Sequence, residues 1–388
     1  MTAADYGDTV DLTELDCSTI TLTQGEIVSN AGTVLGPGAD RLTIDGGGID
    51  RVFNFPPGSN VYDLAIRHGH VVGDYASGGC IGGFLTIRLI SSRVTDCIAD
   101  GESSAVGGGI ASGYGVSLVD SVVTGNTAIA ASGLARGGGV YGPYGGVGAF
   151  YSTIAGNVAA GASGSEGGGA FAGGAGGLVH STVSGNSADT GGGLFLTQGF
   201  LVPAMLEIDD STVSGNVAHA NGGGVASTFT TSAAVANSTI AFNRAETAPG
   251  GGLDVASNQS MSLTLQSSIV AMNTGYYAGY GFFGSDLHTS SPSQLTVVGS
   301  NNLVMRSQLP VPPDTLSADP MLAPLAANGG PTMTHALLPG SPAIDAGNDA
   351  AGLDTDQRGP GYARRSGLAT DIGAFEVVMD LIFANGFD

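Results

Sequence analysis

The sequence predicts an all-β protein, a single-stranded right-handed parallel β-helix with about 30 residues in each coil. Three observations predict this fold: a motif of the STVSGN type recurs at a nearly constant step, a Gly triplet recurs between its copies, and apolar residues alternate with polar ones around both. A unit of three short strands cannot bury its apolar side alone, so successive units must stack. Stacking at the ~4.8 Å spacing of strands produces three parallel sheets around a narrow core.

The repeat is clearest in a column of Asn residues that closes each motif. The steps between them are 31, 29, 30, 27 and 30 residues, and the column consists of Asn126, Asn157, Asn186, Asn216, Asn243 and Asn273. Cys97 takes the same place in an earlier, degenerate copy, Ser92–Cys97. We expect each Asn to adopt the left-handed conformation and to bond its amide to the coils above and below.

Three apolar columns predict the three strands of each coil. The first follows the Gly triplet and contains Ile110, Val140, Ala170, Leu194, Val225 and Leu253. The second precedes the Ser and contains Leu89, Leu118, Ala149, Leu178, Ile208, Val235 and Leu265. The third lies within the motif and contains Val94, Val123, Ile154, Val183, Val213, Ile240 and Val270. Because side chains alternate along a strand, all three columns should face the core. The Gly triplets should supply unusual backbone angles and allow close approach of neighbouring coils.

The regularity of the repeat divides the chain into four parts. We expect an N-terminal cap and first coil in residues 1–40 and regular coils in residues 41–274. Irregular coils and a cap should follow in residues 275–376 and close the far end, before a tail in residues 377–388.

The composition limits the partners of such a molecule. Gly is abundant (67 residues), all 11 basic residues are Arg, and 33 acidic residues bring the net charge to −22. This charge repels nucleic acid and anionic membranes, whereas a sugar polymer is compatible with it, an anionic one through a local Arg cluster. No apolar stretch reaches the ~18 residues of a membrane span, so no membrane insertion is expected. The acidic, Lys-free composition favours a secreted or cell-surface protein whose signal peptide has been removed. Three cysteines, Cys17, Cys80 and Cys97, allow one disulfide and one thiol without fixing the pairing.

The repeats and the C-terminal third resemble known families. The alternation of GGG(I/V/L) with xxNxA is similar to the repeats of polymorphic outer-membrane proteins. The C-terminal series resembles the choice-of-anchor Q domain, through Asn301–Val304, Asp319-Pro320, Asn328–Thr332, Leu338–Gly347, Asp356–Gly359 and Asp371–Glu376. The segment Leu381–Asp388 is similar to a terminal motif of some secreted bacterial proteins. The resemblance implies a surface or secreted β-helix of the pectate-lyase-like superfamily, in which both adhesin-like proteins and sugar enzymes occur.

A cluster of basic residues in the early coils suggests a polysaccharide lyase. β-Elimination on a uronate needs a cation beside the carboxylate and groups that move protons. Arg88 and Arg93 should point outward and hold the carboxylate, while a His or a Tyr moves the proton. The candidate catalytic residues are Arg67, His68, His70, Arg88 and Arg93. Alternatively these side chains pair with acidic neighbours, namely Asp63, Asp74, Asp96 and Asp100.

Aromatic residues recur on the outer side of the strand that follows the triplet. Stacked rings bind the apolar faces of sugars, so substrate binding is expected at Tyr114, Arg136, Tyr141, Tyr144, Phe171 and Phe195. Alternatively, the rings form a ladder that supports the sheet, or one that a loop covers.

Titratable residues near the turns suggest a third chemistry. Two carboxylates across a groove could hydrolyse a glycosidic bond, and the candidates are Glu166, Asp189, His180 and Tyr151. The alternative is that such residues cap turns, as expected also for Asp345, Asp356 and Asp371. No zinc-binding spacing is present. Asp and Asn at the acidic turns could supply oxygen ligands to Ca²⁺, but no Asp-x-Asp-x-Asp-Gly loop supports such a site, and no cofactor is expected.

These patterns predict a protein that binds an extracellular polysaccharide and cleaves it as a lyase. A non-catalytic adhesin and a glycoside hydrolase are the alternatives. The oligomeric state stays open.

Overall fold

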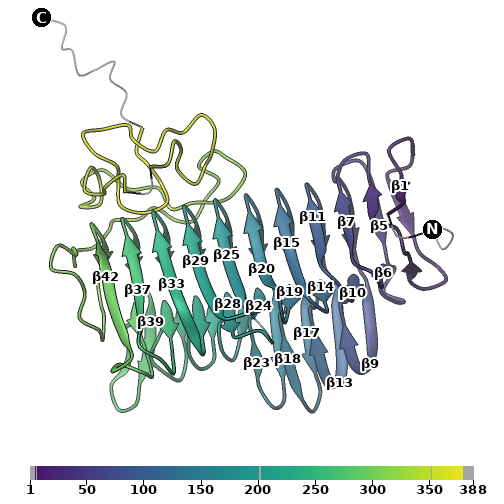
Figure 1. The fold of residues 1–388 in the computed structure, drawn as a ribbon, viewed down its shortest axis with the longest axis horizontal. Coiled ribbons are helices and arrows are strands. Elements are labelled where there is room, and N and C mark those ends of the chain that lie inside the picture. The colour runs from purple at the N-terminus through teal and green to yellow at the C-terminus, as the bar shows by residue number, and fades with distance from the viewer. Residues whose placement is uncertain (1–4, 6, 201, 351, 379–388) are drawn as a thin grey trace, which may run out of the picture.

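The computed structural model confirms an all-β right-handed parallel β-helix (Figure 1) and describes residues 5, 7–200, 202–350 and 352–378. The tail motif at Leu381–Asp388 therefore lies outside the described residues. Each coil passes through sheet A, sheet B, an excursion and sheet C, and then returns to sheet A one strand further on. In the register of sheet B, Val123 pairs with Ile154, and Ile154 pairs with Val183, so the predicted step is also the step of the fold. No helix able to cross a bilayer occurs among the described residues.

Sheets A and B lie on either side of a tight turn. Sheet A consists of β1 (Thr9–Asp11), β4 (Thr33–Leu35), β7 (Ser59–Tyr62), β11 (Ile87–Ile90), β15 (Gly115–Val119), β20 (Gly146–Phe150), β25 (Ala175–Val179), β29 (Ala204–Asp209), β33 (Thr230–Ala236), β37 (Met261–Gln266) and β42 (Leu295–Ser300). Sheet B consists of β2 (Thr19–Thr21), β5 (Thr43–Asp45), β8 (Ala65–Arg67), β12 (Arg93–Thr95), β16 (Val122–Thr124), β21 (Thr153–Ala155), β26 (Thr182–Ser184), β30 (Thr212–Ser214), β34 (Thr239–Ala241), β38 (Ile269–Ala271) and β43 (Leu303–Val304).

Sheet C closes the core, and its strands from β14 (Ile110–Ser112) to β36 (Leu253–Val255) begin directly after the Gly triplets. It consists of β3 (Ile27–Val28), β6 (Phe53–Phe55), β10 (Ile81–Gly83), β14 (Ile110–Ser112), β19 (Val140–Gly142), β24 (Ala170–Gly173), β28 (Leu194–Thr197), β32 (Val225–Ser227), β36 (Leu253–Val255) and β41 (Leu287–His288). The three predicted apolar columns are all buried and belong to one continuous core, which confirms their inward direction.

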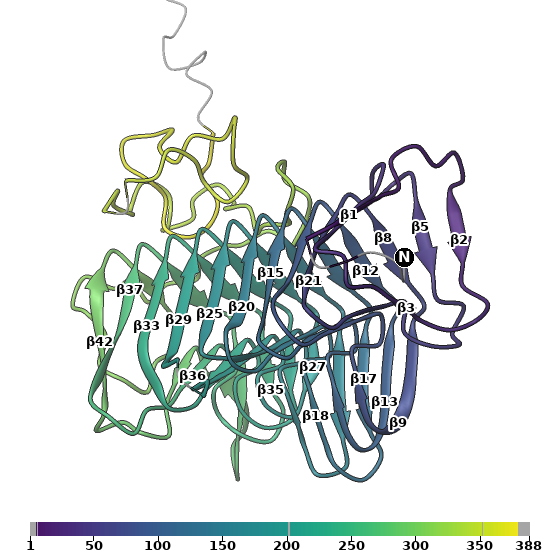
Figure 2. The ribbon, with the colours of Figure 1, turned by 45° about the vertical axis from the view of Figure 1, so that its right-hand side comes forward.

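A fourth sheet, sheet D, was not predicted. It consists of β9 (His70–Ser77), β13 (Ile98–Val106), β17 (Thr127–Ala130), β18 (Leu134–Arg136), β22 (Val158–Gly161), β23 (Ser165–Glu166), β27 (Ser187–Ala188), β31 (Val217–Ala218), β35 (Arg244–Ala245), β39 (Thr274–Tyr277) and β40 (Gly281–Gly284). In the N-terminal half its strands leave the helix and return, and together they form a flange below the coils (Figures 1 and 2). A small core made almost entirely of Ala side chains fills the flange, among them Ala99, Ala105 and Ala128.

The Asn column forms the predicted ladder. The backbone N–H and the side-chain Nδ2 of Asn157 both donate to Oδ1 of Asn186 at 2.9 Å, and the same pair of bonds recurs from Asn126 to Asn273. The expected left-handed conformation of the Asn residues is wrong. The preceding residue adopts it instead, Gly185 in one coil (φ 63°) and Met272 in another (φ 60°), because that residue must reverse the chain so that the amide points into the core.

The Gly triplets have the two expected roles, divided among their members. Gly107 adopts φ 59°, which side chains disfavour. A Cβ on Gly108 would lie 2.2 Å from the carbonyl oxygen of Gly138 in the next coil, so only Gly allows this close approach.

The C-terminal region only partly closes the far end. Residues 305–316 cover it, with Leu309 joining the core. Residues 317–378, which we call the strap, turn back instead and lie along the coils (Figures 1 and 2). The strap packs on the outer side of sheet B, where its Leu337, Ala343 and Ile372 contact Ile269 and Leu303. Asp345 and Asp371 accept backbone N–H bonds there, so they do cap turns, but turns of the strap.

Candidate functional site

A groove runs along the outer side of sheet A, through two neighbouring depressions that reach from Thr33 to Gly177. Its floor is a single column of outward residues in register on neighbouring strands: Thr33, Asn60, Arg88, Ser117, Gly148, Gly177 and Glu207. Alternation along each strand points these residues away from the core. Small side chains at Ser117, Gly148 and Gly177 keep the middle of the floor flat.

One edge of the groove is lined by aromatic residues at the turn between sheets C and A. Tyr114 and Tyr144 lie on adjacent coils and are 47% and 48% exposed, and Phe200 makes an edge-to-face contact with Tyr144 at 6.2 Å. The three rings surround a depression of about 380 Å³.

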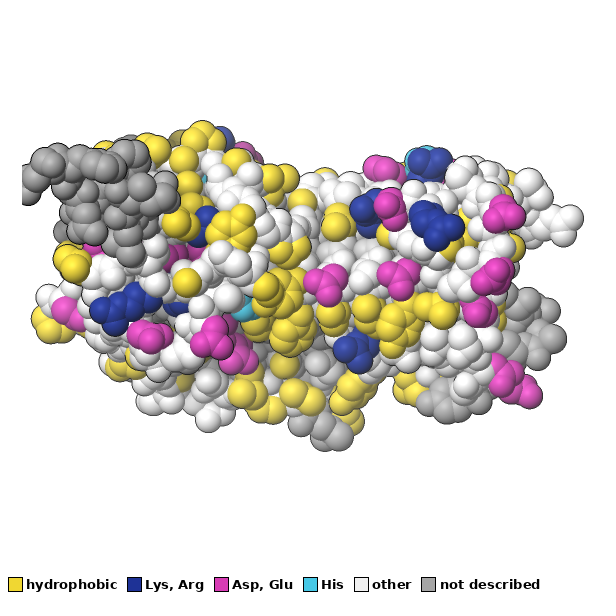
Figure 3. Space-filling view, turned by 90° about the horizontal axis from the view of Figure 1, so that it is seen from above, with side chains coloured by type: hydrophobic (Ala, Val, Ile, Leu, Met, Phe, Trp, Pro, Cys, Tyr) yellow, Lys and Arg dark blue, Asp and Glu magenta, His cyan; other side chains and the backbone are white. Residues whose placement is uncertain are grey.

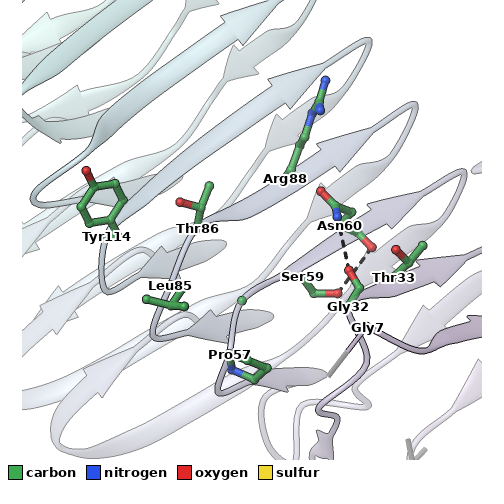
Figure 4. Close-up of a pocket in the computed structure, with 11 residues that line it drawn as sticks. Gly7, Gly32, Thr33, Pro57, Ser59, Asn60, Leu85, Thr86, Arg88 and Tyr114 are labelled. Atoms are coloured by element: carbon green, nitrogen blue, oxygen red, sulfur yellow. Dashed lines mark hydrogen bonds between the residues drawn. The ribbon is translucent and has the colours of Figure 1, made fainter. Parts of the chain in front are cut away.

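One part of the groove lies beside Arg88. A depression of about 670 Å³ is bounded by Arg88 and Asn60 on the strands and by Pro57, Leu85 and Tyr114 on the turns (Figure 4). Arg88 is exposed and extends away from the sheet, and no carboxylate among the described residues lies within ion-pairing distance of it. It is therefore a cation available to a ligand.

Two carboxylates that the sequence reasoning missed lie further along the same sheet. Glu207 and Asp209 point outward from β29, two residues apart. Burial, together with the negative charge of Glu207, raises the pKa of Asp209 to about 6. Register places Glu207 four strands from Arg88, roughly 19 Å along the groove. Apolar and acidic residues alternate in the sequence MLEID, which indicates that both carboxylates point outward. This alternation does not show that they lie on the same sheet as Arg88.

The five candidate lyase residues do not meet. Arg67 and His68 contact Asp45, at 2.9 and 3.2 Å, on the outer side of sheet B. Hydrogen bonds from Gly47 and Arg67 hold the pKa of Asp45 below its usual value although burial opposes them.

The remaining members of that cluster lie on three different sheets. Arg93 is on sheet B, His70 lies on sheet D 3.8 Å from Asp100, and only Arg88 reaches the groove on sheet A. Figure 3 shows the side of the molecule that carries the strap, where basic and acidic side chains lie together near the N-terminal end.

The predicted aromatic column is a covered ladder. Tyr141, Phe171 and Phe195 stack at 5.1 and 5.6 Å, but the two Phe side chains are only 6% and 5% exposed. Arg136 lies over Phe171 and pairs with Glu166 at 2.7 Å. Tyr141, Arg136 and Glu166 therefore stabilise the junction of sheets C and D, whereas Tyr114 and Tyr144 present rings to solvent.

The other titratable candidates lie at two further places. Tyr151 and His180 stack at 4.6 Å on the turns between sheets A and B, both with positive φ, and the strap buries His180. Asp189 accepts a hydrogen bond from Ser165 and lines a depression of about 260 Å³ on sheet D. A second missed pair, His288 and Asp254, is bonded at 2.9 Å but buried on sheet C.

No group of three or more metal-ligating side chains occurs among the described residues. Comparisons of the chain with family models, with curated proteins and with solved structures find no match. Any function assigned to the chain thus rests on the geometry of the groove.

Proposed function

We propose that this chain is a secreted or surface β-helix protein that binds an anionic extracellular polysaccharide along the groove on sheet A. The observation that carries the proposal is Arg88, an exposed arginine without an ionic partner among the described residues. It lines a depression of about 670 Å³ in a groove with aromatic rings along one edge. A guanidinium binds a carboxylate through two parallel hydrogen bonds. Tyr rings stack on the apolar faces of sugars.

The length of the groove favours a polymer over a small molecule. Floor positions repeat at the ~4.8 Å strand spacing, which is close to the length of one sugar unit. Arg88 can bind the carboxylate of a uronate, and the flat, uncharged floor beside it can hold neutral sugars. The groove therefore suits a chain in which a uronate alternates with, or adjoins, neutral sugars.

The cysteines support a location outside the cytosol. Cys80 and Cys97 form a disulfide within the core, and such bonds persist mainly in oxidising compartments. The resemblance of the C-terminal series to the choice-of-anchor Q domain points the same way.

The residues around Arg88 favour β-elimination as the chemistry of this part of the groove. Arg88 would neutralise the uronate carboxylate and stabilise the charge that develops when the adjacent proton leaves. Tyr114 lines the same depression and is the side chain there that can exchange a proton. His68 and His70 point to other faces and take no part.

The test is binding to a panel of uronate and neutral polysaccharides, followed by analysis of products. Arg88→Ala should weaken uronate binding about tenfold, or ~1.4 kcal/mol, whereas Arg93→Ala, which removes an exposed arginine from sheet B, should leave it unchanged. Products that absorb as unsaturated uronates would establish the lyase, and binding without products would establish an adhesin. Equal binding of uronate and neutral polymers by the unmodified chain would contradict the proposal.

The raised pKa of Asp209 favours a second candidate, glycoside hydrolysis at the other end of the groove. A carboxyl group with a pKa of about 6 is protonated in a substantial fraction of molecules at mildly acidic pH and can act there as a general acid, with Glu207 as its partner. New reducing ends without unsaturated products, lost in Asp209→Asn but kept in Arg88→Ala, would support it.

A further inference from the structure

One buried contact fastens the strap to the coils. The side chain of Gln357 is completely buried and is enclosed by three threonines: Thr182 on β26, Thr212 on β30 and Thr332 on the strap itself. Thr182 and Thr212 are paired residues on neighbouring strands of sheet B, so their hydroxyls reach the carboxamide side by side.

The nitrogen of this carboxamide has more oxygen neighbours than hydrogens. Nε2 lies 3.0 Å from Oγ1 of Thr182, 3.0 Å from Oγ1 of Thr332, 3.0 Å from the carbonyl oxygen of Met333 and 3.2 Å from that of Ser181. A carboxamide nitrogen carries only two hydrogens. Four surrounding oxygens would stabilise departing ammonia, or ammonium, better than they stabilise the amide.

Only one of the three hydroxyls has no other acceptor. Oγ1 of Thr182 donates to the carbonyl oxygen of Met333 at 2.7 Å, and that of Thr332 donates to the carbonyl oxygen of His180 at 3.0 Å. The hydroxyl of Thr212 has Gln357 as its partner, with 2.6 Å between Oγ1 and Oε1. Thr212 is therefore the one of the three hydroxyls whose own hydrogen bond goes to the carboxamide, and this bond holds its oxygen beside the carbonyl group of Gln357.

Two buried titratable side chains lie next to this contact. His180 and Asp210 occupy the same turn position on neighbouring coils, and both lie close to Asp356 and Arg364. Nδ1 of His180 and both carboxylate oxygens of Asp210 are buried without a hydrogen bond among the described residues, and Oδ1 of Asp210 lies 3.9 Å from Nη1 of Arg364. Burial lowers the pKa of His180 and raises that of Asp210 to about 8, so near neutral pH one can accept a proton and the other can donate one.

We infer that Thr212 and Gln357 form an intramolecular ester that covalently fastens the strap to the helix. Oγ1 of Thr212 attacks Cδ of Gln357, an Oγ1–Cδ bond forms, and the Cδ–Nε2 bond breaks. The hydroxyl proton leaves with the nitrogen as ammonia, so the step needs no oxidant, reductant or other reactant. Burial excludes the water that would otherwise hydrolyse the ester.

The test is the intact mass of the purified full-length chain under denaturing, non-reducing conditions. The expected mass is lower than that of the sequence by one ammonia, after the two hydrogens lost in the disulfide are allowed for. Mild hydroxylamine should cleave the ester. A chain with the full amide mass would overturn the inference, and because this measurement uses the unmodified protein it does not depend on any variant folding.

Matched variants assign the bond. Thr212→Val should restore the full mass, whereas Thr182→Val, which removes the paired hydroxyl on the adjacent strand, should keep the loss of ammonia. A succinimide at Asn328-Gly329 also releases ammonia, but it would persist in Thr212→Val. Persistence of the loss in Thr212→Val, or its disappearance in Thr182→Val, would contradict the assignment to Thr212.

Discussion

The Asn residues at the corner of each coil form the most regular set of interactions in the molecule. Oδ1 of Asn186 accepts both donors of Asn157, while its own Nδ2 donates to Asn216 and to the carbonyl oxygen of Ile154. Each amide thus uses its whole bonding capacity inside the core, where water cannot replace it. One substitution leaves several buried groups without partners.

Asn186→Ala should therefore lower the free energy of unfolding by about 3 kcal/mol, because the two donors of Asn157 lose their acceptor. Urea titration monitored by circular dichroism measures this loss. Asn258→Ala, at an exposed turn residue, is the matched control and should cost less than about 0.5 kcal/mol. A loss in Asn186→Ala no larger than in the control would show that the ladder adds no stability.

At the scale of the strand and turn, the ladder ends in two different ways. At its C-terminal end Asp286 replaces an Asn and accepts both donors of Asn273. At its N-terminal end a disulfide takes over: Cys80 stands where other coils have the third Gly of the triplet, and Cys97 stands in the Asn column. The backbone N–H of Cys97 still donates to Asn126, so the disulfide continues the column with a covalent bond.

Cys80→Gly with Cys97→Asn should rebuild one more rung of the ladder. The new Asn can donate to Asn126 and accept from Gly69, whose N–H now contacts the sulfur of Cys80. Loss of a disulfide that closes a loop of this length costs about 3 kcal/mol, and the new hydrogen bonds should recover part of it. Thermal unfolding without reductant should rank this double variant above Cys80→Ala with Cys97→Ala. Equal melting temperatures of the two double variants would show that the new Asn does not replace the disulfide as a rung of the ladder.

Sequence patterns predicted the three core sheets because Val, Leu and Ile mark an inward strand without ambiguity. They did not predict sheet D, because its small core consists of Ala residues such as Ala99 and Ala128, which occur in any structure. The site was harder still. Arg88 and Arg93 are five residues apart and both exposed, yet the turn at Ser91-Ser92 places them on different sheets. The strap has no periodic pattern, so the face that it covers could not be predicted.

At the scale of the whole molecule, the strap brings carboxyl groups into a buried interface. Burial raises the pKa of Glu376 to about 7 and that of Asp210 to about 8. Both groups ionise at much lower pH in the unfolded chain, so above neutral pH the folded state holds more protons than the unfolded state. Stability then falls as the pH rises. Burial lowers the pKa values of His180 and His335, so these two residues make stability rise with pH. Their effect ends at the ordinary pKa of His, because above it both are neutral in the folded and in the unfolded chain.

The free energy of unfolding should consequently decrease by on the order of 1–2 kcal/mol between about pH 7 and about pH 9. Urea titrations across this range measure it. Glu376→Gln should make the dependence shallower, although it costs stability at every pH, because Glu376 accepts two backbone N–H bonds. Glu246→Gln, at a more exposed glutamate, should leave the slope unchanged. A stability that is constant or rises over this range would contradict the expected linkage.

The strap also determines where the number of coils can change during evolution. Its side chains meet particular coils, from Tyr151 through Thr182 and Thr212 to Ser267, so gain or loss of a coil beneath it would displace every later contact by one strand spacing, ~4.8 Å. The coils before Tyr151 have no such contact among the described residues. Recombination between near-identical repeats could lengthen or shorten the molecule there, and it would add or remove one sugar-length step of the groove beside Arg88 each time.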